Sequence, residues 1–208
     1  MHILLTDILT CPRCGPEFGL ILLADEVEER QVLAGGLGCS NCREMYRIEG
    51  GAVDLRTVEG AEVAPAEADA ETAMRLAALL GLAGAGGTVL VAGPGAELAP
   101  AVAALVPGLQ VVAFTPRPVP GEVRPGVSRV AGGPGIPFRG GMLRGVALTG
   151  GAGEASLGEA IRVLAPGTRL VVDPAPDGAA EELRGLGAEV LLEQDGVVVA
   201  AKPGATGR

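Results

Sequence analysis

Two Cys-x-x-Cys pairs near the start of the 208-residue chain constrain its fold more than any other feature. They run from Cys11 to Cys14 and from Cys39 to Cys42, and they contain all four cysteines of the sequence. Four thiolates in two such pairs are the ligand set that tetrahedral zinc takes in structural sites. Gly15 and Asn41 are residue types that tolerate the left-handed backbone of a tight metal-binding turn. The pattern therefore predicts a metal centre with Cys11, Cys14, Cys39 and Cys42 as ligands.

Spacing alone leaves three other uses of these cysteines open: two disulfides, a redox-active dithiol, or an iron centre held by the same four sulfurs. Disulfides are typical of secreted proteins, whereas the stretch from Met1 to Thr10 contains Asp7 and lacks the charged head of a secretory signal. Four protein ligands leave no open coordination position. We therefore predict that the metal is structural and holds together a module too small to fold alone.

The composition predicts a folded protein with a core of Ala, Val and Leu. Hydrophobic residues make up 48% of the chain, aromatic residues only 2%, and Trp is absent. The formal charge of -9 disfavours nucleic-acid binding, because that function needs clustered Lys and Arg. Residues 76–96 and 98–116 are uncharged, but repeated Gly and Pro argue against membrane spans. We expect a cytoplasmic protein with no membrane segment.

The motifs around the cysteines follow a recognisable order. An apolar stretch, Leu4 to Leu9, precedes the first pair, and the charged stretch from Asp25 to Gln31 separates the pairs. The second pair leads into Tyr46-Arg47-Ile48 and a turn at Gly50-Gly51. Over residues 3–56 this order resembles the Trm112p-like zinc-ribbon family. The resemblance implies an accessory module or partner of methyltransferases, so we expect a protein partner or self-association.

The rest of the chain alternates between helix-like and β-like stretches. Residues 57–70 are acidic, Ala-rich and contain a proline, as a linker does. From residue 71 onward the alternation predicts a parallel sheet with helices on both faces. We therefore expect an N-terminal module over 1–56, a linker over 57–70 and an α/β domain over 71–208.

Local signals predict where individual elements begin and end. Ser156 and Glu159 have the spacing of a helix capping box, and Pro166-Gly167 is expected to end that helix. Asp177 is expected to cap the next helix. Four prolines within residues 115–127 predict a loop where a crossover helix would be expected. Asp195-Gly196 predicts a closing antiparallel hairpin.

Three motifs of the C-terminal region share the features of one enzyme family. A Gly-rich turn, Gly93-Pro94-Gly95, follows a β-like stretch; Ile136-Pro137-Phe138 precedes a later strand; and a segment from Glu159 to Gly167 precedes Leu170 to Val172. Over residues 71–203 they resemble class I S-adenosylmethionine-dependent methyltransferases. The resemblance implies an α/β fold class, a Rossmann-like methyltransferase-type sheet after the small zinc ribbon. It also implies a cofactor pocket that contains Gly93, Gly95, Phe114 and Phe138.

The same resemblance fails where those enzymes carry acidic cofactor contacts. Val91 stands at the acidic position before the turn, and the second strand ends in Phe114-Thr115-Pro116 instead of Asp or Glu. Gly132-Gly133 and Leu143-Arg144 stand at two further acidic positions. Four such losses remove most of the directional recognition of the cofactor, since each hydrogen bond to a ligand contributes about 1–3 kcal/mol.

The sequence thus supports a zinc-stabilised scaffold or partner protein whose methyltransferase-like domain has lost S-adenosylmethionine binding, a pseudoenzyme. We predict no catalytic residues, because His2 is the only histidine and lies at the chain start. One alternative is an active methyltransferase with a rearranged pocket in which Gly93 and Gly95 still approach the cofactor. A different ligand in the same crevice is a third hypothesis.

Overall fold

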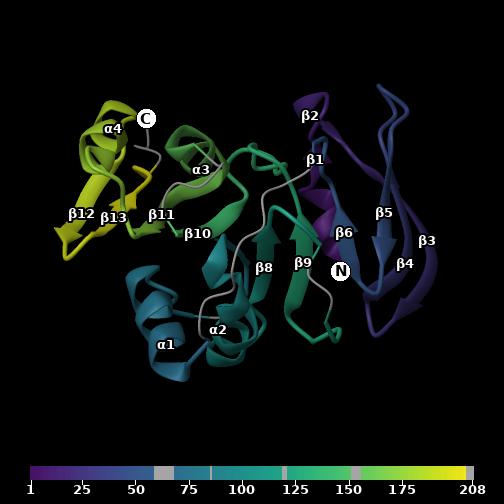
Figure 1. The fold of residues 1–208 in the computed structure, drawn as a ribbon, viewed down its shortest axis with the longest axis horizontal. Helices are drawn as coiled ribbons and strands as arrows, with labels where there is room; N and C mark the ends of the chain where they lie inside the picture. The colour runs from purple at the N-terminus through teal and green to yellow at the C-terminus, as the bar shows by residue number, and fades with distance from the viewer. Residues whose placement is uncertain (59–67, 85, 119–120, 151–155, 205–208) are drawn as a thin grey trace.

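A single sheet runs through both the N-terminal and the C-terminal parts of the protein (Figure 1). The computed structural model describes residues 1–58, 68–84, 86–118, 121–150 and 156–204. Eleven strands form this sheet in the order β12-β13-β11-β10-β7-β8-β9-β6-β5-β4-β3, and β1 and β2 form a separate hairpin. The strands are β1 (Thr10–Cys11), β2 (Gly15–Gly19), β3 (Ile21–Glu28), β4 (Gln31–Gly38), β5 (Met45–Glu49), β6 (Ala52–Asp54), β7 (Thr88–Ala92), β8 (Gln110–Thr115), β9 (Val127–Ala131), β10 (Leu143–Thr149), β11 (Leu164–Asp173), β12 (Glu189–Gln194) and β13 (Val197–Ala201).

The C-terminal part has the predicted α/β architecture. Strands β9, β8, β7, β10 and β11 are parallel neighbours in this order, which is the 3-2-1-4-5 order of doubly wound sheets. Strand β13 runs antiparallel to β11, and β12 pairs with β13 as the predicted closing hairpin. Its turn residues Asp195 (φ 52°) and Gly196 (φ 75°) have the two positive φ angles of a type I′ turn.

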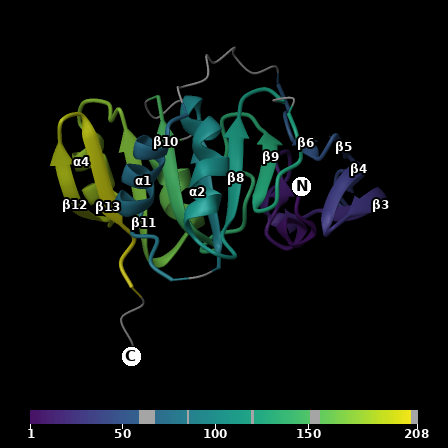
Figure 2. The same ribbon diagram turned by 90° about the horizontal axis from the view of Figure 1, so that it is seen from below.

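Helices cover both faces of this sheet (Figures 1 and 2). Strand residues alternate between two cores: Val89 and Val91 pack with α1 and α2, whereas Leu90 packs with α3 and α4. The helical elements are η1 (Ile3–Asp7), α1 (Ala70–Leu79), η2 (Pro94–Leu98), α2 (Ala99–Leu105), α3 (Leu157–Val163) and α4 (Ala179–Gly185). Among the described residues, no helix is long and apolar enough to cross a membrane.

The N-terminal segment, residues 1–56, joins the sheet through its last strand. Strand β6 pairs in parallel with β9, with Val53 opposite Val130. The ladder continues through the Leu55 N–H, which donates to the Ala131 carbonyl at 2.8 Å. The Arg129 guanidinium of β9 donates to the Gly50 carbonyl at 2.6 Å. The edge of the C-terminal sheet is therefore covered by the N-terminal segment instead of facing water.

The same segment also replaces a helix. Residues 132–142, which connect the parallel strands β9 and β10, form no helix. Leu9 instead forms a β-bridge with Phe138, and the Thr10 N–H donates to the Pro137 carbonyl at 2.9 Å. Both Leu9 and Phe138 are fully buried in one core cluster. The N-terminal segment thus covers a sheet face that a crossover helix would otherwise cover.

Two predicted helix boundaries are wrong. Helix α3 ends at Val163, not at Pro166-Gly167, because Leu164 is already extended and pairs with Leu143 of β10. Asp177 does not cap α4: the N-cap is Gly178, which is left-handed and makes no side-chain cap hydrogen bond. The Ser156 cap is confirmed, since its hydroxyl accepts the Glu159 N–H at 3.2 Å.

The two predicted loops are only partly described. Residues 116–118 and 121–126 contain no helix, which agrees with the predicted loop over 115–127. Most of the predicted linker lies outside the described residues, and α1 already begins at Ala70. The proposed domain boundaries at 56 and 70 therefore stay predictions.

Candidate functional site

The four cysteine sulfurs converge in the N-terminal segment. All four Sγ atoms lie within 4.8 Å of one another. The Cys11–Cys42 and Cys14–Cys39 separations are 3.7 and 3.8 Å, and a tetrahedron with Zn–S bonds of about 2.3 Å places its sulfurs about 3.8 Å apart. A disulfide would need sulfurs about 2.05 Å apart, and all four cysteines are free. They are therefore positioned to bind a metal ion, as the spacing predicts.

Tight turns present these sulfurs. Gly15, after the first pair, has the predicted left-handed backbone with a φ of 97°. At the second pair, the residue with a left-handed backbone is Arg43 (φ 63°), directly after Cys42. The prediction that Asn41 has this conformation is therefore wrong. The Arg43 N–H donates to the Cys39 carbonyl at 2.9 Å, which closes the turn directly after the second pair.

The thiols of the second pair differ in acidity because different groups face them. Burial raises the pKa of Cys39, but hydrogen bonds from the backbone N–H groups of Cys42 and Asn41, together with those of the neighbouring thiols, lower it to about 7. The backbone N–H of Glu44 lowers the pKa of Cys42, but burial and the neighbouring thiols raise it to about 12. Four thiols packed this closely cannot all ionise without a cation among them, and this favours a bound metal.

Two side chains contact the sulfurs of the first pair. The Tyr46 hydroxyl lies 3.3 Å from Cys11 Sγ, and the Asn41 side-chain amide donates to Cys14 Sγ at 3.3 Å. Tyr46 is buried in β5. Burial and then the hydrogen bond with Cys11 raise the pKa of Tyr46 above its ordinary value. The phenol therefore stays protonated at neutral pH.

A charged pair on α3 holds the segment that packs against the N-terminal region. The Arg162 guanidinium donates to the Ile136 and Phe138 carbonyls at 2.8 and 2.7 Å. It also pairs with Glu159 at 2.8 Å. These contacts hold residues 136–138 in the extended form that pairs with Leu9. The sequence places Glu159 in a capping box, and only the structure shows its ion pair.

We expect this pair to make stability sensitive to acid. Hydrogen bonds from Arg162 lower the pKa of Glu159 below its ordinary value of 4.5. A carboxyl whose folded-state pKa is depressed adds stability above the unfolded pKa and loses it as pH falls through the folded pKa. Between neutral pH and pH values below 4.5, Glu159→Gln should therefore lose less stability than the unmodified protein. Urea unfolding across this range measures the difference.

The exposed residue Glu181 of α4 offers a control for that experiment. Glu181→Gln removes a surface charge of the same type without touching Arg162. If Glu181→Gln changes the acid dependence as much as Glu159→Gln does, the ion pair is not its source.

The Gly-rich turn after β7 packs against the end of β10. The Gly95 N–H donates to the Thr149 hydroxyl at 2.7 Å, and that hydroxyl donates to the Ala92 carbonyl at 2.6 Å. A Cβ atom on Gly93 would lie 2.2 Å from the Thr149 carbonyl oxygen, and one on Gly95 would lie 2.7 Å from Thr149 Cγ2. Close approach to Thr149 therefore explains both glycines without a ligand.

The other N–H groups of this turn are also paired. The Gly93 N–H donates to the Phe114 carbonyl, and the Ala96 N–H donates to the Gly93 carbonyl, both at 3.0 Å. Pro94 has no N–H to offer. Thr149 is not among the residues predicted for this site, although a hydroxyl residue at the end of a buried strand is a signal for it. No N–H of residues 93–96 is left for a ligand.

The structure brings together only some of the predicted cofactor residues. Gly93, Gly95 and Phe114 lie around the end of β7, where a cavity of about 300 Å³ is lined in part by Gly95, Thr149 and the ion-paired Arg75 and Asp173. Phe138 lies against Leu9 of the N-terminal segment. Its predicted role in the pocket stays a prediction that this placement does not support.

Contacts within the protein surround two of the positions where the resemblance to methyltransferases implies an acid. The Phe114 ring covers Gly132 so closely that a Cβ there would lie 2.4 Å from it. Arg144 donates to the carbonyls of Ala83, Gly84 and Gly86, which ties the strand to the loop before β7. Phe114 and Gly132 lie at the carboxyl ends of β8 and β9, whereas Arg144 lies at the start of β10, at the opposite end of the sheet from the Gly-rich turn, and supports the fold there.

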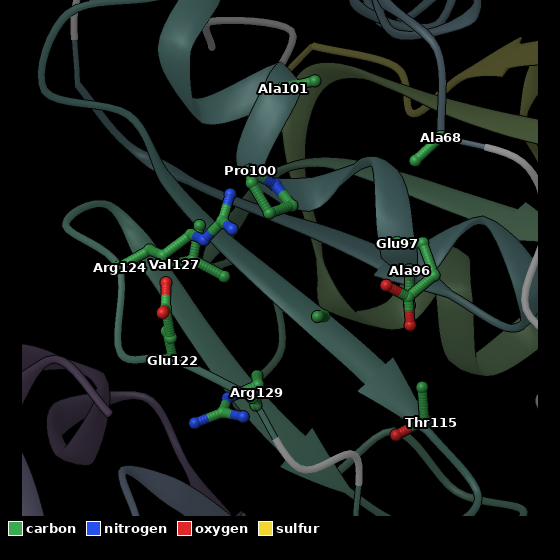
Figure 3. A pocket seen from close by; sticks show the side chains of 12 residues that line it. Ala68, Ala96, Glu97, Pro100, Ala101, Thr115, Glu122, Arg124, Val127 and Arg129 are labelled. Atoms are coloured by element: carbon green, nitrogen blue, oxygen red, sulfur yellow. The ribbon is translucent and has the colours of Figure 1, made fainter.

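A second hollow, of about 520 Å³, lies on the α2 side of β8 and β9 (Figure 3). It occupies the place that a β8–β9 crossover helix would cover, and Ala113, Val127 and Pro100 form apolar parts of its lining. Figure 3 shows Glu97 and Arg124 at opposite sides of it. The described lining contains no Ser, Cys or His, so it offers no such nucleophile or imidazole base.

Comparison with known families agrees with the cysteine geometry. Residues 2–51 match the model of the Trm112p-like protein family. This Trm112p-like segment contains all four sulfur ligands and the Tyr46 strand, so the predicted resemblance is confirmed. No curated protein sequence matches the chain significantly.

Solved structures are similar in fold to large parts of the chain. The [4+2]-cyclase SpnF has a TM-score of 0.52 and 15% identity, with 65% of this chain and 81% of that chain covered. A candidate S-adenosyl-L-methionine-dependent methyltransferase from Methanococcus maripaludis has a TM-score of 0.42 and 12% identity, with 66% and 86% covered. The tRNA (m1A58) methyltransferase TrmI from Aquifex aeolicus has a TM-score of 0.45 and 12% identity, with 90% and 97% covered. The SpnF match, whose TM-score exceeds 0.5, supports the α/β fold of this chain, and at 15% identity it shows the fold alone.

Proposed function

We propose that this protein is a zinc-stabilised scaffold whose methyltransferase-like domain does not bind S-adenosylmethionine. In this proposal residues 1–56 form the zinc ribbon and residues 71–208 the second domain. The zinc ion, held by Cys11, Cys14, Cys39 and Cys42, supplies no reaction. It cross-links two turns of a segment that otherwise has a small core.

The first partner of the zinc ribbon is the domain that follows it in the same chain. Strand β6 already pairs with β9, and Leu9 already packs on Phe138. A separate methyltransferase would have to displace these contacts to use the same surfaces. The arrangement supports a ribbon that acts within its own chain, by covering one sheet edge and one sheet face of its neighbour.

The closed Gly-rich turn carries the proposal that cofactor binding is lost. Helix N-termini and Gly-rich turns bind ligands through free N–H groups, and here those of Gly93, Gly95 and Ala96 all donate to protein oxygens. Removing a hydrogen-bonding partner from a ligand site costs about 1–3 kcal/mol, and four acidic partners are absent from this sequence.

Calorimetric titration of the zinc-loaded protein with S-adenosylmethionine and S-adenosylhomocysteine tests this proposal. We expect no binding at millimolar cofactor. Micromolar affinity for either compound would contradict it, and would favour the active methyltransferase in which Gly93 and Gly95 approach the cofactor. The zinc content of the same sample should be one ion per chain. This control shows that an absence of cofactor binding is measured on protein with an intact metal centre.

A further inference from the structure

The hydrogen bonds to the four sulfurs come from two different sources. In the second pair, backbone N–H groups of Asn41 and Cys42 face Cys39, and that of Glu44 faces Cys42. In the first pair, two side chains lie at hydrogen-bond distance: Tyr46 at 3.3 Å from Cys11 and Asn41 at 3.3 Å from Cys14. Backbone donors come with the turn itself, whereas side-chain donors depend on residue type.

A zinc ion with four thiolates leaves two uncompensated negative charges on the sulfurs. A thiolate can only accept a hydrogen bond, so the protonated Tyr46 hydroxyl must donate to Cys11 once the metal is bound. Hydrogen bonds to charged groups are among the stronger ones, and here Tyr46 is only 5% exposed. Water cannot easily replace the phenol at Cys11 Sγ.

We infer that Tyr46 and Asn41 are positioning residues of the metal centre, which disperse charge on Cys11 and Cys14 and strengthen metal binding. This inference rests on the proposed zinc site and extends it to the surrounding residues. Donors outside the ligand set typically change metal affinity by 10–100-fold. They also make a thiolate less nucleophilic, so Cys11 and Cys14 should resist alkylation while both donors are present.

Tyr46→Phe and Asn41→Ala test the inference, because each removes one donor and Tyr46→Phe keeps the buried ring. Competition with a chromogenic chelator should show zinc affinity about tenfold lower for each variant and lower still for the double variant. In cobalt-substituted protein, the sulfur-to-cobalt charge-transfer band should move to lower energy, since a thiolate without its donor holds its electrons less tightly. Zinc release by iodoacetamide should be faster.

Ile48→Val is the matched packing control. Ile48 is buried on the same face of β5 as Tyr46, two residues further along the strand. Its side chain has no group that could donate a hydrogen bond to a sulfur. It should leave the cobalt spectrum unchanged. Zinc affinity within twofold of the unmodified protein and an unshifted cobalt band in Tyr46→Phe and Asn41→Ala would overturn the inference. A failure of the unmodified protein to bind zinc would instead overturn the proposed function, so the two failures are distinguishable.

Discussion

Removing the metal should unfold the N-terminal segment and destabilise the sheet that it completes. Structural zinc sites contribute about 10–16 kcal/mol of apparent binding free energy, which is comparable to the whole stability of about 5–15 kcal/mol expected for a domain. Unfolding of this segment would release the β6–β9 pairing and the Leu9–Phe138 contact. We expect a chelator or Cys39→Ser to lower the thermal midpoint and to remove amide protection from β9.

Ser40→Ala gives a matched control for this prediction. Ser40 lies inside the second Cys-x-x-Cys pair and is exposed, so its removal changes the same turn without removing a ligand. Hydrogen exchange followed in β6 and β9 separates loss of the metal from a local change in the turn. A metal-free protein with unchanged midpoint and unchanged protection would refute a structural role for the metal.

Phe138→Ala should be among the most destabilising single substitutions outside the metal centre. Phe138 has 0% exposure and belongs to the largest fully buried side chains of the described residues. Truncating a buried Phe to Ala typically costs about 3–5 kcal/mol, because transfer and cavity terms add. The cavity would open between Leu9 and residues 136–138, so both parts of the protein should loosen together. Urea unfolding of metal-loaded protein measures the cost.

Phe18→Ala is the corresponding control on an exposed ring. Phe18 lies in β2 with 38% exposure, so its truncation should cost less than about 1 kcal/mol. Equal costs for the two variants would contradict the placement of Phe138 at the junction. A large cost for Phe138→Ala without loss of protection at Leu9 and Thr10 would mean that the two parts do not unfold together.

Local sequence patterns predict much of the fold. The helices and strands after residue 70 follow from periodicity, and the closing hairpin follows from Asp195-Gly196 because two residues with positive φ suffice to specify it. The boundary errors are also local in origin. Pro166-Gly167 was expected to end α3, but pairing of Leu164 with Leu143 ends it three residues earlier, and that pairing depends on a distant strand.

The candidate sites divide in the same way. The spacing of the cysteines predicts the four metal ligands, because two Cys-x-x-Cys pairs supply all the ligands of a tetrahedral metal centre. The contact between Gly95 and Thr149 spans 54 positions, and that between Tyr46 and Cys11 spans 35. Local patterns do not say which distant residue each one meets, so neither the pairing of Gly95 with Thr149 nor that of Tyr46 with Cys11 is predicted.

By itself, the sequence determined the four clustered cysteines, the α/β alternation and the absence of acidic residues where the resemblance to methyltransferases implies cofactor contacts. These properties depend on residue type and on short spacing. Only the tertiary structure decided that β6 pairs with β9 at the edge of the sheet, and that Leu9 packs on Phe138 where a crossover helix would otherwise lie. It also decided that the Thr149 hydroxyl accepts a hydrogen bond from the Gly-rich turn. Such contacts join residues far apart in the chain, and their free energy depends on burial and hydrogen bonding that exist only after the chain has folded.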